Sequence, residues 1–481
     1  MASAQQPNWL SLPVEIWLRI LSLEILLRDL AEFCLTCSGF LSITRPILYR
    51  YLTLTAEKRD STPNLAVTNT FALLARDPDL ALTVRELTLD SHSKSQSYSR
   101  NPDLLNLPAL RNLTQLKCVT LIGDISRLAT RTTVAHFVEI LHNLHLDTLR
   151  FPSPNVRPFI LALNPAQLAQ LANPRHLVLH AGQADHNALL VPQLNTILTT
   201  ARTSLTSLSL TGRDVHLSVL FAVHFPLLRS LAIINLFDIQ FSCPPGFNAF
   251  LSAHHETIQE LHLGYTDRSN KRCPATILFD EASGLRPEFL PQLQVFRGHC
   301  SNLEMMASAR MHCLGNLREV TTGSALQEPR LVIADIHRML DALEAVGPLN
   351  ALETLDCDVF QWRREEYDVI PTFVNRWAAL CGPTLKVWRT LLPNQGSWPA
   401  ELFTAFPHLR SIYFPRDIKT LSLLDISHRA AVPDEEVRKI AETCTALEEV
   451  NIVSSLVDDE EDICWKVYRS VLGLDVRQVS G

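Results

Sequence analysis

Short alternations of apolar and polar residues recur along most of the chain. A complete copy places apolar residues at the first, fourth and sixth of six positions, as in Val84–Leu89, Leu116–Leu121 and Leu352–Cys357. An alternation of period two predicts a short β-strand with one buried face. Thirteen copies follow one another at a mean spacing of about 30 residues, which indicates a repeat architecture. Their central apolar residues are Leu87, Val119, Leu149, Leu177, Leu208, Leu231, Leu261, Phe296, Val320, Leu355, Trp388, Ile412 and Val450.

Helical patterns occupy segments between these copies. Apolar residues recur at intervals of three and four over 134–144, 336–346 and 437–447, which predicts amphipathic helices. One strand and one helix per repeat form a unit that cannot bury its apolar faces alone. Neighbouring units therefore have to stack into one continuous core. We accordingly predict an α/β solenoid over residues 80–455, and the alternative is another α/β fold in which the strand motifs recur by coincidence.

The repeated pattern resembles that of leucine-rich repeats, L-x-x-L-x-L-x-x-N/C. The resemblance implies an irregular horseshoe, because the Asn or Cys position is mostly absent and the spacing ranges from 23 to 38 residues. The copies around Phe296 and Val320 are the weakest. Leucine accounts for 81 of the 481 residues, and the need to fill a continuous core explains this excess.

Residues 12–52 carry helical patterns without the strand repeat. A segment of about 40 residues is too short for a stable core of its own, so it has to dock on the solenoid, on a partner or on both. It looks like an F-box, although Ser38-Gly39 replaces the usual basic residue, and its end from Pro46 to Arg50 is similar to F-boxes of filamentous fungi. The matching residues are Leu12-Pro13, Glu15-Ile16, Ile20-Leu21, Asp29-Leu30 and Leu35-Thr36-Cys37.

The F-box resemblance implies a partner and a division of the chain. F-box proteins bind a Skp-type adaptor, which links them to a cullin–RING ubiquitin ligase. The expected adaptor-binding residues are Leu12, Pro13, Ile16, Ile20, Leu30, Leu35 and Tyr49. The alternative is that these residues are buried against their own neighbours in the module. The expected divisions are an N-terminal tail at 1–11, an F-box-like helical module at 12–52, a connecting helical segment at 53–79, the array at 80–455 and a C-terminal cap or tail at 456–481.

The residues between the apolar members of each strand point away from the core. In a leucine-rich array they lie on the concave face, where we expect a protein substrate to bind; the alternative is an ordinary solvated sheet face. The mixture of charge signs suits a protein better than a polyanion. The candidate substrate-binding residues are Arg150, His176, His262, Arg297, Asp356, Arg389 and Tyr413.

Composition narrows the function further. Lys and Arg number 43 against 50 Asp and Glu, and this net charge of −7 disfavours nucleic acid as a partner. Only 15 glycines are present, and no G-x-S-x-G elbow, Walker loop or G-x-G-x-x-G motif occurs. We therefore expect no enzymatic activity, cofactor or metal, and we disfavour a hydrolase. The leading hypothesis is a substrate receptor of an SCF-type ubiquitin ligase, and the alternative is a scaffold whose N-terminal helices only cap the solenoid.

Other signals are weaker. His142-x-x-His145 and Cys34-x-x-Cys37 have metal-like spacing, but both lie within apolar helical patterns and lack a second pair. His255-Glu256 begins like a zinc-protease motif, but the second histidine is missing. The apolar stretch from Leu10 to Leu30 is interrupted by five charged residues, so we expect neither a signal peptide nor a membrane span. We expect a soluble protein of the cytoplasm, the nucleus or both, with reduced cysteines.

Overall fold

The computed structural model divides the chain into two compact units, residues 1–207 and 208–481. It describes residues 44–45, 47–55, 65–91, 107–123, 131–171, 173–181, 190–212, 214–235, 246–264, 279, 284–323, 329–358, 369–390, 403–416, 434–454, 463–470 and 473–480. Residues 12–43 of the F-box-like module lie outside these ranges, and so do six of the seven expected adaptor contacts. The seventh, Tyr49, is half-buried in a turn in which its backbone N–H donates to the Arg45 carbonyl at 3.1 Å.

The first unit alternates strands and helices. Asp77 caps one of the helices by accepting a hydrogen bond from the Leu80 N–H, and Pro78 occupies the first helical position, where a proline loses no bond. The elements are β1 Tyr51–Thr55, α4 Leu65–Arg76, α5 Pro78–Ala81, β2 Glu86–Asp90, α6 Leu107–Asn112, β3 Cys118–Ile122, α7 Arg131–Asn143, β4 Thr148–Phe151, the 3₁₀ helix Pro154–Val156, α8 Arg157–Ala162, α9 Pro165–Leu171, β5 His176–His180 and α10 Val191–Ala201.

The second unit begins within β6 and continues the same alternation. It ends in two antiparallel strands instead of a further helix. The elements are β6 Ser207–Gly212, α11 Asp214–Phe221, β7 Ser230–Asn235, α12 Phe247–His254, β8 Glu260–Leu263, β9 Val295–His299, α13 Cys300–Ser308, the 3₁₀ helix His312–Asn316, β10 Glu319–Gly323, α14 Pro329–Val346, β11 Thr354–Asp358, α15 Ile370–Cys381, β12 Val387–Thr390, β13 Ser411–Arg416, α16 Asp434–Thr443, β14 Glu449–Ser454, β15 Ile463–Ser470 and β16 Gly473–Ser480.

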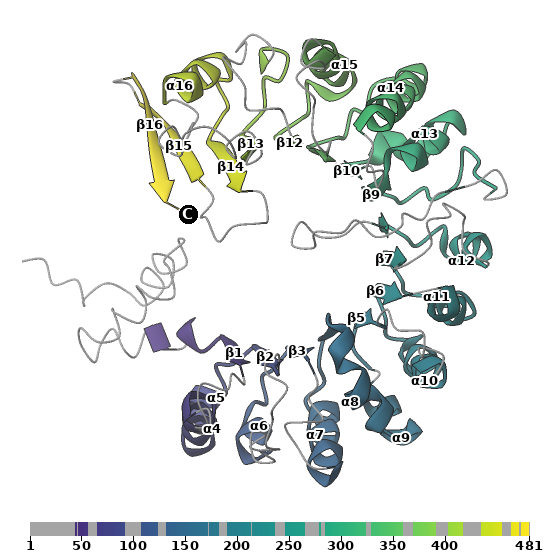
Figure 1. The fold of residues 1–481 in the computed structure, drawn as a ribbon, viewed down its shortest axis with the longest axis vertical. Coiled ribbons are helices and arrows are strands. Elements are labelled where there is room, and N and C mark those ends of the chain that lie inside the picture. Colours follow the sequence, from purple (N-terminus) through teal and green to yellow (C-terminus); the bar gives the residue numbers. More distant parts are fainter. Residues whose placement is uncertain are drawn as a thin grey trace, which may run out of the picture. The chain divides into compact units, whose positions relative to one another are not determined.

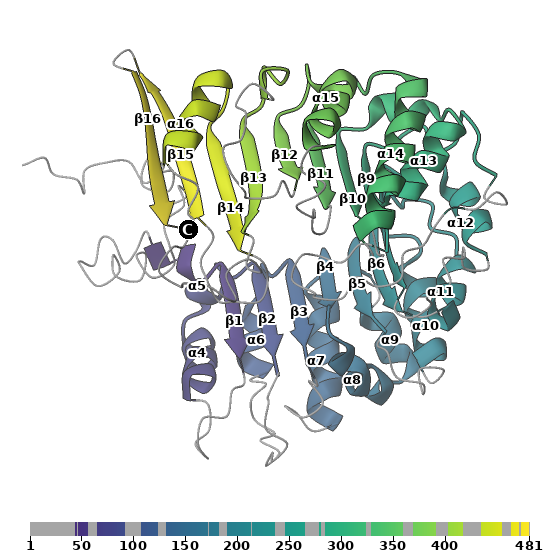
Figure 2. The same ribbon diagram turned by 45° about the horizontal axis from the view of Figure 1, so that its top comes forward.

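The strands of each unit follow one another in chain order across a sheet that is parallel except at the β15–β16 hairpin (Figure 2). The central apolar residues of all thirteen sequence copies lie on strands β2 to β14, and each of them is at most 1% exposed. This confirms the predicted strand repeat, including the two weakest copies, which form β9 and β10. The three predicted helices are present as α7, α14 and α16.

Helices cover one side of the sheet in each unit (Figure 1). Their apolar stripes meet the inward residues of the strands, as the buried residues Phe137 and Val138 of α7 and Met339 and Leu340 of α14 illustrate. The opposite side of the strands carries no helix among the described residues. We call this uncovered side the strand face of each unit.

The sheet extends beyond the expected array at both ends of the chain. β1 lies in the last residues of the expected F-box module and the first of the connecting segment, and it pairs in parallel with β2. The expected C-terminal cap contains β15 and β16, which form an antiparallel hairpin on β14. The hairpin lacks the apolar spacing of the repeat, whereas β1 has it, with Tyr49, Leu52 and Leu54 at the first, fourth and sixth positions, in residues that we assigned to the F-box-like module and the connecting segment.

The backbone carbonyl of the residue that precedes a strand fixes the register of the following strand. In the second unit the Arg318 carbonyl accepts hydrogen bonds from the N–H groups of Glu353 and Thr354, at 2.9 Å each, and the Glu353 carbonyl accepts from Lys386 and Val387 at 2.8 and 3.0 Å. Each carbonyl thus accepts from two consecutive N–H groups of the following repeat. Because a slip of one residue would turn the apolar set outward, this ladder holds the inward and outward residues of all strands in step.

Candidate functional site

The strand face of the second unit carries a continuous row of outward residues. The register pairs His262 with Arg297, then Thr321, Asp356, Arg389, Tyr413 and Asn451, with one residue from each of the strands β8 to β14. Five of the seven expected substrate-binding residues therefore lie side by side. The structure adds Thr321 and Asn451, which occupy the same outward position of their repeats. We call these seven residues the central row.

Two arginines of the central row are held by different contacts. Arg297 donates to one carboxylate oxygen of Glu319 on β10, from Nε at 3.0 Å and from Nη2 at 2.6 Å. Arg389 lies over the Tyr413 ring, with its guanidinium carbon 4.9 Å from the ring centroid. The Arg389 Nε is buried and has no hydrogen-bond partner within the described part of the chain. This arginine therefore keeps one donor that no described residue uses.

His262 is uncharged at neutral pH. Burial lowers its pKa to about 4, and the nearby positive charge of Arg297 contributes to the same shift. Its Nε2 is buried without a hydrogen-bond partner among the described residues. The imidazole consequently offers one polar nitrogen rather than a positive charge.

Asp356 and Thr321 lie deeper than their neighbours in the row, at 5% and 4% exposure. Asp356 is the register neighbour of both Thr321 and Arg389. The row thus places these two buried short side chains between two pairs of longer, half-buried ones, His262 with Arg297 and Arg389 with Tyr413. The arrangement offers hydrogen-bond groups of both charge signs along seven strands.

A second pair of charges borders the row at the C-terminal hairpin. Lys466 of β15 donates to Glu449 of β14 at 2.6 Å, and this bond is the largest cause of the lowered pKa of Glu449. Sequence reasoning missed both residues. Glu449 lies on the predicted strand around Val450, two residues before Asn451. Lys466 belongs to a strand without the repeat pattern, so no sequence signal marks it.

The first unit carries the other two expected substrate-binding residues, and it does not place them in one row. Arg150 is the register partner of Thr120 and Val178, while His176 is the partner of Thr148. Both side chains are exposed. Cys118 also lies on this strand face, although it is only 6% exposed, and burial raises the pKa of its thiol.

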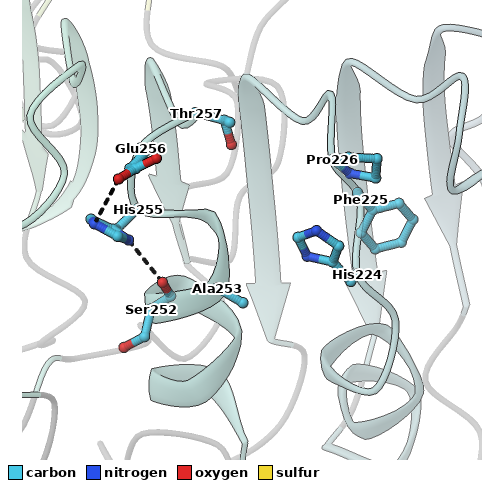
Figure 3. Close-up of a pocket in the computed structure, with 8 residues that line it drawn as sticks. All are labelled: His224, Phe225, Pro226, Ser252, Ala253, His255, Glu256 and Thr257. Carbon is cyan, nitrogen blue, oxygen red and sulfur yellow. Dashed lines mark hydrogen bonds and ion pairs between the residues drawn. The ribbon is translucent and has the colours of Figure 1, made fainter.

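A pocket of about 360 Å³ lies in the second unit, between the segment that follows α11 and the C-terminal end of α12 with the residues after it (Figure 3). The His255 Nδ1 bonds the Ser252 carbonyl oxygen at 2.9 Å, and its Nε2 lies 3.9 Å from a Glu256 carboxylate oxygen. His224 lies across the pocket in Figure 3. The lining residues are His224, Phe225, Pro226, Ser252, Ala253, His255, Glu256 and Thr257.

The histidine beneath this pocket has a structural role. His254 is 2% exposed; its Nε2 accepts from the Phe225 N–H at 2.9 Å and its Nδ1 donates to the Phe250 carbonyl at 2.7 Å. Burial is the main cause of its lowered pKa. His142, the first histidine of the pair with metal-like spacing, forms an exposed hydrogen bond from its Nδ1 to the Gln170 carbonyl oxygen at 3.0 Å.

One group of described side chains is compact enough to share a metal ion. His299, Cys300 and Asp335 are all buried, and one ligand atom from each lies within 4.8 Å of the others. Sequence reasoning missed this group, because Asp335 comes from α14 and only the adjacent His299-Cys300 pair is visible in the sequence.

The comparisons with known proteins do not identify a family. No family model matches the chain, and no curated protein matches it. Similar solved structures include the leucine-rich-repeat-containing protein LegL7 from Legionella pneumophila, with a TM-score of 0.29, 10% identity and coverage of 84% of this chain and 91% of that one. The complex of Rad7 and Elc1 in yeast gives a TM-score of 0.32, 14% identity and coverage of 73% and 83%.

A Bacteroides fragilis protein gives a TM-score of 0.25 and 12% identity, with 84% and 86% of the two chains covered. At such low TM-scores these likenesses carry no argument about function. The fold class rests on the chain's own repeats. Strands in chain order, of which β2 to β14 are centred on the apolar repeat, with helices on one side, define an irregular α/β array of the leucine-rich-repeat type. None of the described helices is both long and apolar enough to cross a membrane.

Proposed function

We propose that this chain is a non-enzymatic protein-interaction subunit that binds its substrate protein on the strand face of the second unit. The central row from His262 to Asn451 is the observation that carries the proposal. Seven strands about 4.8 Å apart give the row a length of about 29 Å. An extended segment of about nine residues has the same length.

The chemistry of the row favours a protein over a polyanion. Arg297 is already paired with Glu319, and the buried Asp356 adds negative charge beside Arg389. A nucleic acid or another polyanion requires clustered, uncompensated cations, and these are missing from the described row. A polypeptide presents donors, acceptors and both charge signs, which such a row can match.

The finer proposal is that the chain is the substrate receptor of an SCF-type ubiquitin ligase. It rests on the F-box resemblance of residues 12–52 and on their position before the repeats. The module would bind a Skp-type adaptor through apolar side chains, and the repeats would present a protein to the ligase. The cullin–RING ligase would supply the chemistry, so this chain would need no catalytic residue.

A second candidate function is a scaffold without a ligase. β1 is the first strand of the sheet and has only β2 as a neighbour among the described strands. Repeat arrays need a cap over such an edge. The helices expected over residues 12–43 would then cover β1 and contact no adaptor.

Point variants of the full chain can separate these two functions. Deletion of residues 12–52 is unsuitable because it removes Tyr51 and Leu52 of β1, which pair with β2. We would measure binding of a purified Skp-type adaptor to the unmodified chain and to Leu12→Asp and Ile16→Asp, with Leu82→Asp as the control at an exposed apolar residue. The ligase proposal expects binding that both module variants abolish and the control retains. Failure of the folded, unmodified chain to bind would favour the scaffold.

The strand face needs its own test. Arg389→Glu and Tyr413→Ala should weaken binding of a protein that co-purifies with the full chain, and they should leave adaptor binding unchanged. A charge-reversal control at Arg438, on the exposed side of α16, should affect neither interaction. If the strand-face variants bind the co-purified protein as tightly as the unmodified chain, the proposed binding surface is wrong.

A further inference from the structure

A histidine, a cysteine and an aspartate meet in the interior of the second unit. His299 ends β9, Cys300 begins α13, and Asp335 lies on α14. The three residues are 2%, 1% and 7% exposed, and their ligand atoms lie within 4.8 Å of one another. They bring together the nitrogen, sulfur and oxygen ligands that bind zinc in proteins.

The cysteine and histidine of this group already have the spacing of a metal site. The Cys300 Sγ lies 3.7 Å from the His299 Nδ1. In a tetrahedral zinc site with Zn–S of about 2.3 Å and Zn–N of about 2.0 Å, the same two atoms are about 3.6 Å apart. The Asp335 oxygen lies within 4.8 Å of the other ligand atoms, so an approach of at most about 1 Å brings it to bonding distance of a shared ion.

We propose that His299 Nδ1, Cys300 Sγ and an Asp335 oxygen form a binding site for one Zn²⁺ ion, with water in the fourth position. The cysteine binds as a thiolate, so the ligand set carries two negative charges and balances the ion. The thiol proton leaves for solvent when the metal binds. A thiolate ligand also selects zinc over magnesium and calcium.

Two present contacts of the cluster have to adjust. The His299 Nδ1 now accepts a hydrogen bond from the Ser301 N–H at 3.1 Å, and a bond to zinc replaces it. The other ring nitrogen, Nε2, has no partner among the described residues, so no second bond restrains the ring. The metal bond is far stronger than the helix-capping hydrogen bond that is lost.

Arg338 forms the outer layer of the site. It pairs with one oxygen of Asp335, and its Nε lies 3.5 Å from Glu304. A carboxylate has two oxygens, so Asp335 can keep Arg338 on one and bind the metal with the other. Partners of this kind orient metal-binding carboxylates in many sites. The ion would join the end of β9 and the start of α13 to α14, and it would thereby fasten two consecutive repeats.

Cobalt and zinc titrations of the full chain, reduced and stripped of metal, test the proposal. Addition of Co²⁺ should produce a thiolate-to-cobalt charge-transfer band that saturates at one equivalent. One equivalent of Zn²⁺ should abolish the band and raise the melting temperature. Cys300→Ser should remove the band and weaken zinc binding by about 100-fold or more. Cys313→Ser should keep the charge-transfer band and the affinity for zinc, because Cys313 is an equally buried thiol outside the cluster.

A second variant pair keeps the test decisive if Cys300→Ser does not fold. Asp335→Asn should weaken zinc binding by about 10-fold or more, whereas Asp341→Asn, on the same helix but exposed, should not. Circular dichroism without metal confirms that each variant is folded. The proposal is overturned if the folded, unmodified chain gives no charge-transfer band, or if the band survives in Cys300→Ser. The adaptor and substrate experiments are independent of this result.

Discussion

Arg297 on β9 and Glu319 on β10 are joined by two hydrogen bonds to one carboxylate oxygen, at 3.0 Å from Nε and 2.6 Å from Nη2. The same arginine is the register neighbour of His262 on β8. One guanidinium therefore links three strands of the second unit. Its charge holds the carboxylate in place and disfavours protonation of the imidazole.

Replacement of Arg297 by Gln should raise the pKa of His262 above its present value of about 4. The pKa should stay below the ordinary value of 6.5, because burial is the larger cause of the shift and remains. NMR titration of the labelled histidine ring measures it. Arg389→Gln, three strands further along the central row, is the control and should leave this pKa unchanged. An unchanged pKa in Arg297→Gln would contradict the electrostatic coupling.

Acid should destabilise the second unit through His254. Its folded-state pKa lies below the ordinary 6.5, so below about pH 6.5 the unfolded chain takes up a proton that the folded chain does not. The free energy of unfolding should therefore fall as pH drops from 7 to 5. In His254→Gln this fall in the urea midpoint should be smaller, since one titrating group is gone. The exposed His312 provides the control, and His312→Gln should show the same fall as the unmodified chain.

Gly382 follows α15 where backbone atoms leave no room for a side chain. A Cβ at this position would overlap the carbonyl oxygens of Ala378 and Ala405. Gly382→Ala should therefore lower the free energy of unfolding by about 2–3 kcal/mol, because backbone has to move. A Cβ at Gly315 would meet no other atom within 4 Å, so Gly315→Ala should change stability by less than about 1 kcal/mol. Equal urea midpoints for the two variants would refute the steric account.

Arg376 of α15 fastens its helix to α14. Its Nε lies 2.6 Å from Glu344 and its Nη2 lies 2.6 Å from Asp341, and its own side chain is 17% exposed. Arg376→Met should cost about 1 kcal/mol, because it removes several charge-assisted bonds that solvent partly screens. Lys386→Met breaks a single pair with Glu353, exposed on both sides, and should cost at most about 0.5 kcal/mol. Added salt should reduce the difference between the two variants in the free energy of unfolding, measured by denaturant titration.

The sequence predicted the strands well because their signal is local. Leu355 and Trp388 are each the centre of an alternation of period two, which is typical of a strand and not of a helix. Both residues are fully buried on their strands. The weak copies at Phe296 and Val320 also form strands, since pairing with neighbours on both sides compensates for a poor pattern. The β15–β16 hairpin was missed because pairing with an existing sheet, rather than apolar spacing, produces it. β1 was missed although Leu52 and Leu54 follow the repeat spacing, because its residues were assigned to the F-box-like module and the connecting segment.

By itself, the sequence determined the kind of fold and the residues that face away from its core, because both follow from apolar periodicity over a few residues. Tertiary structure alone decided which outward residues are neighbours: register places Arg297 between His262 and Thr321, whereas Arg150 and His176 fall in different rows. It also brought Asp335 to His299 and Cys300, which lie more than 30 residues earlier in the chain. Contacts of this kind depend on how consecutive repeats stack, and no local pattern encodes that stacking.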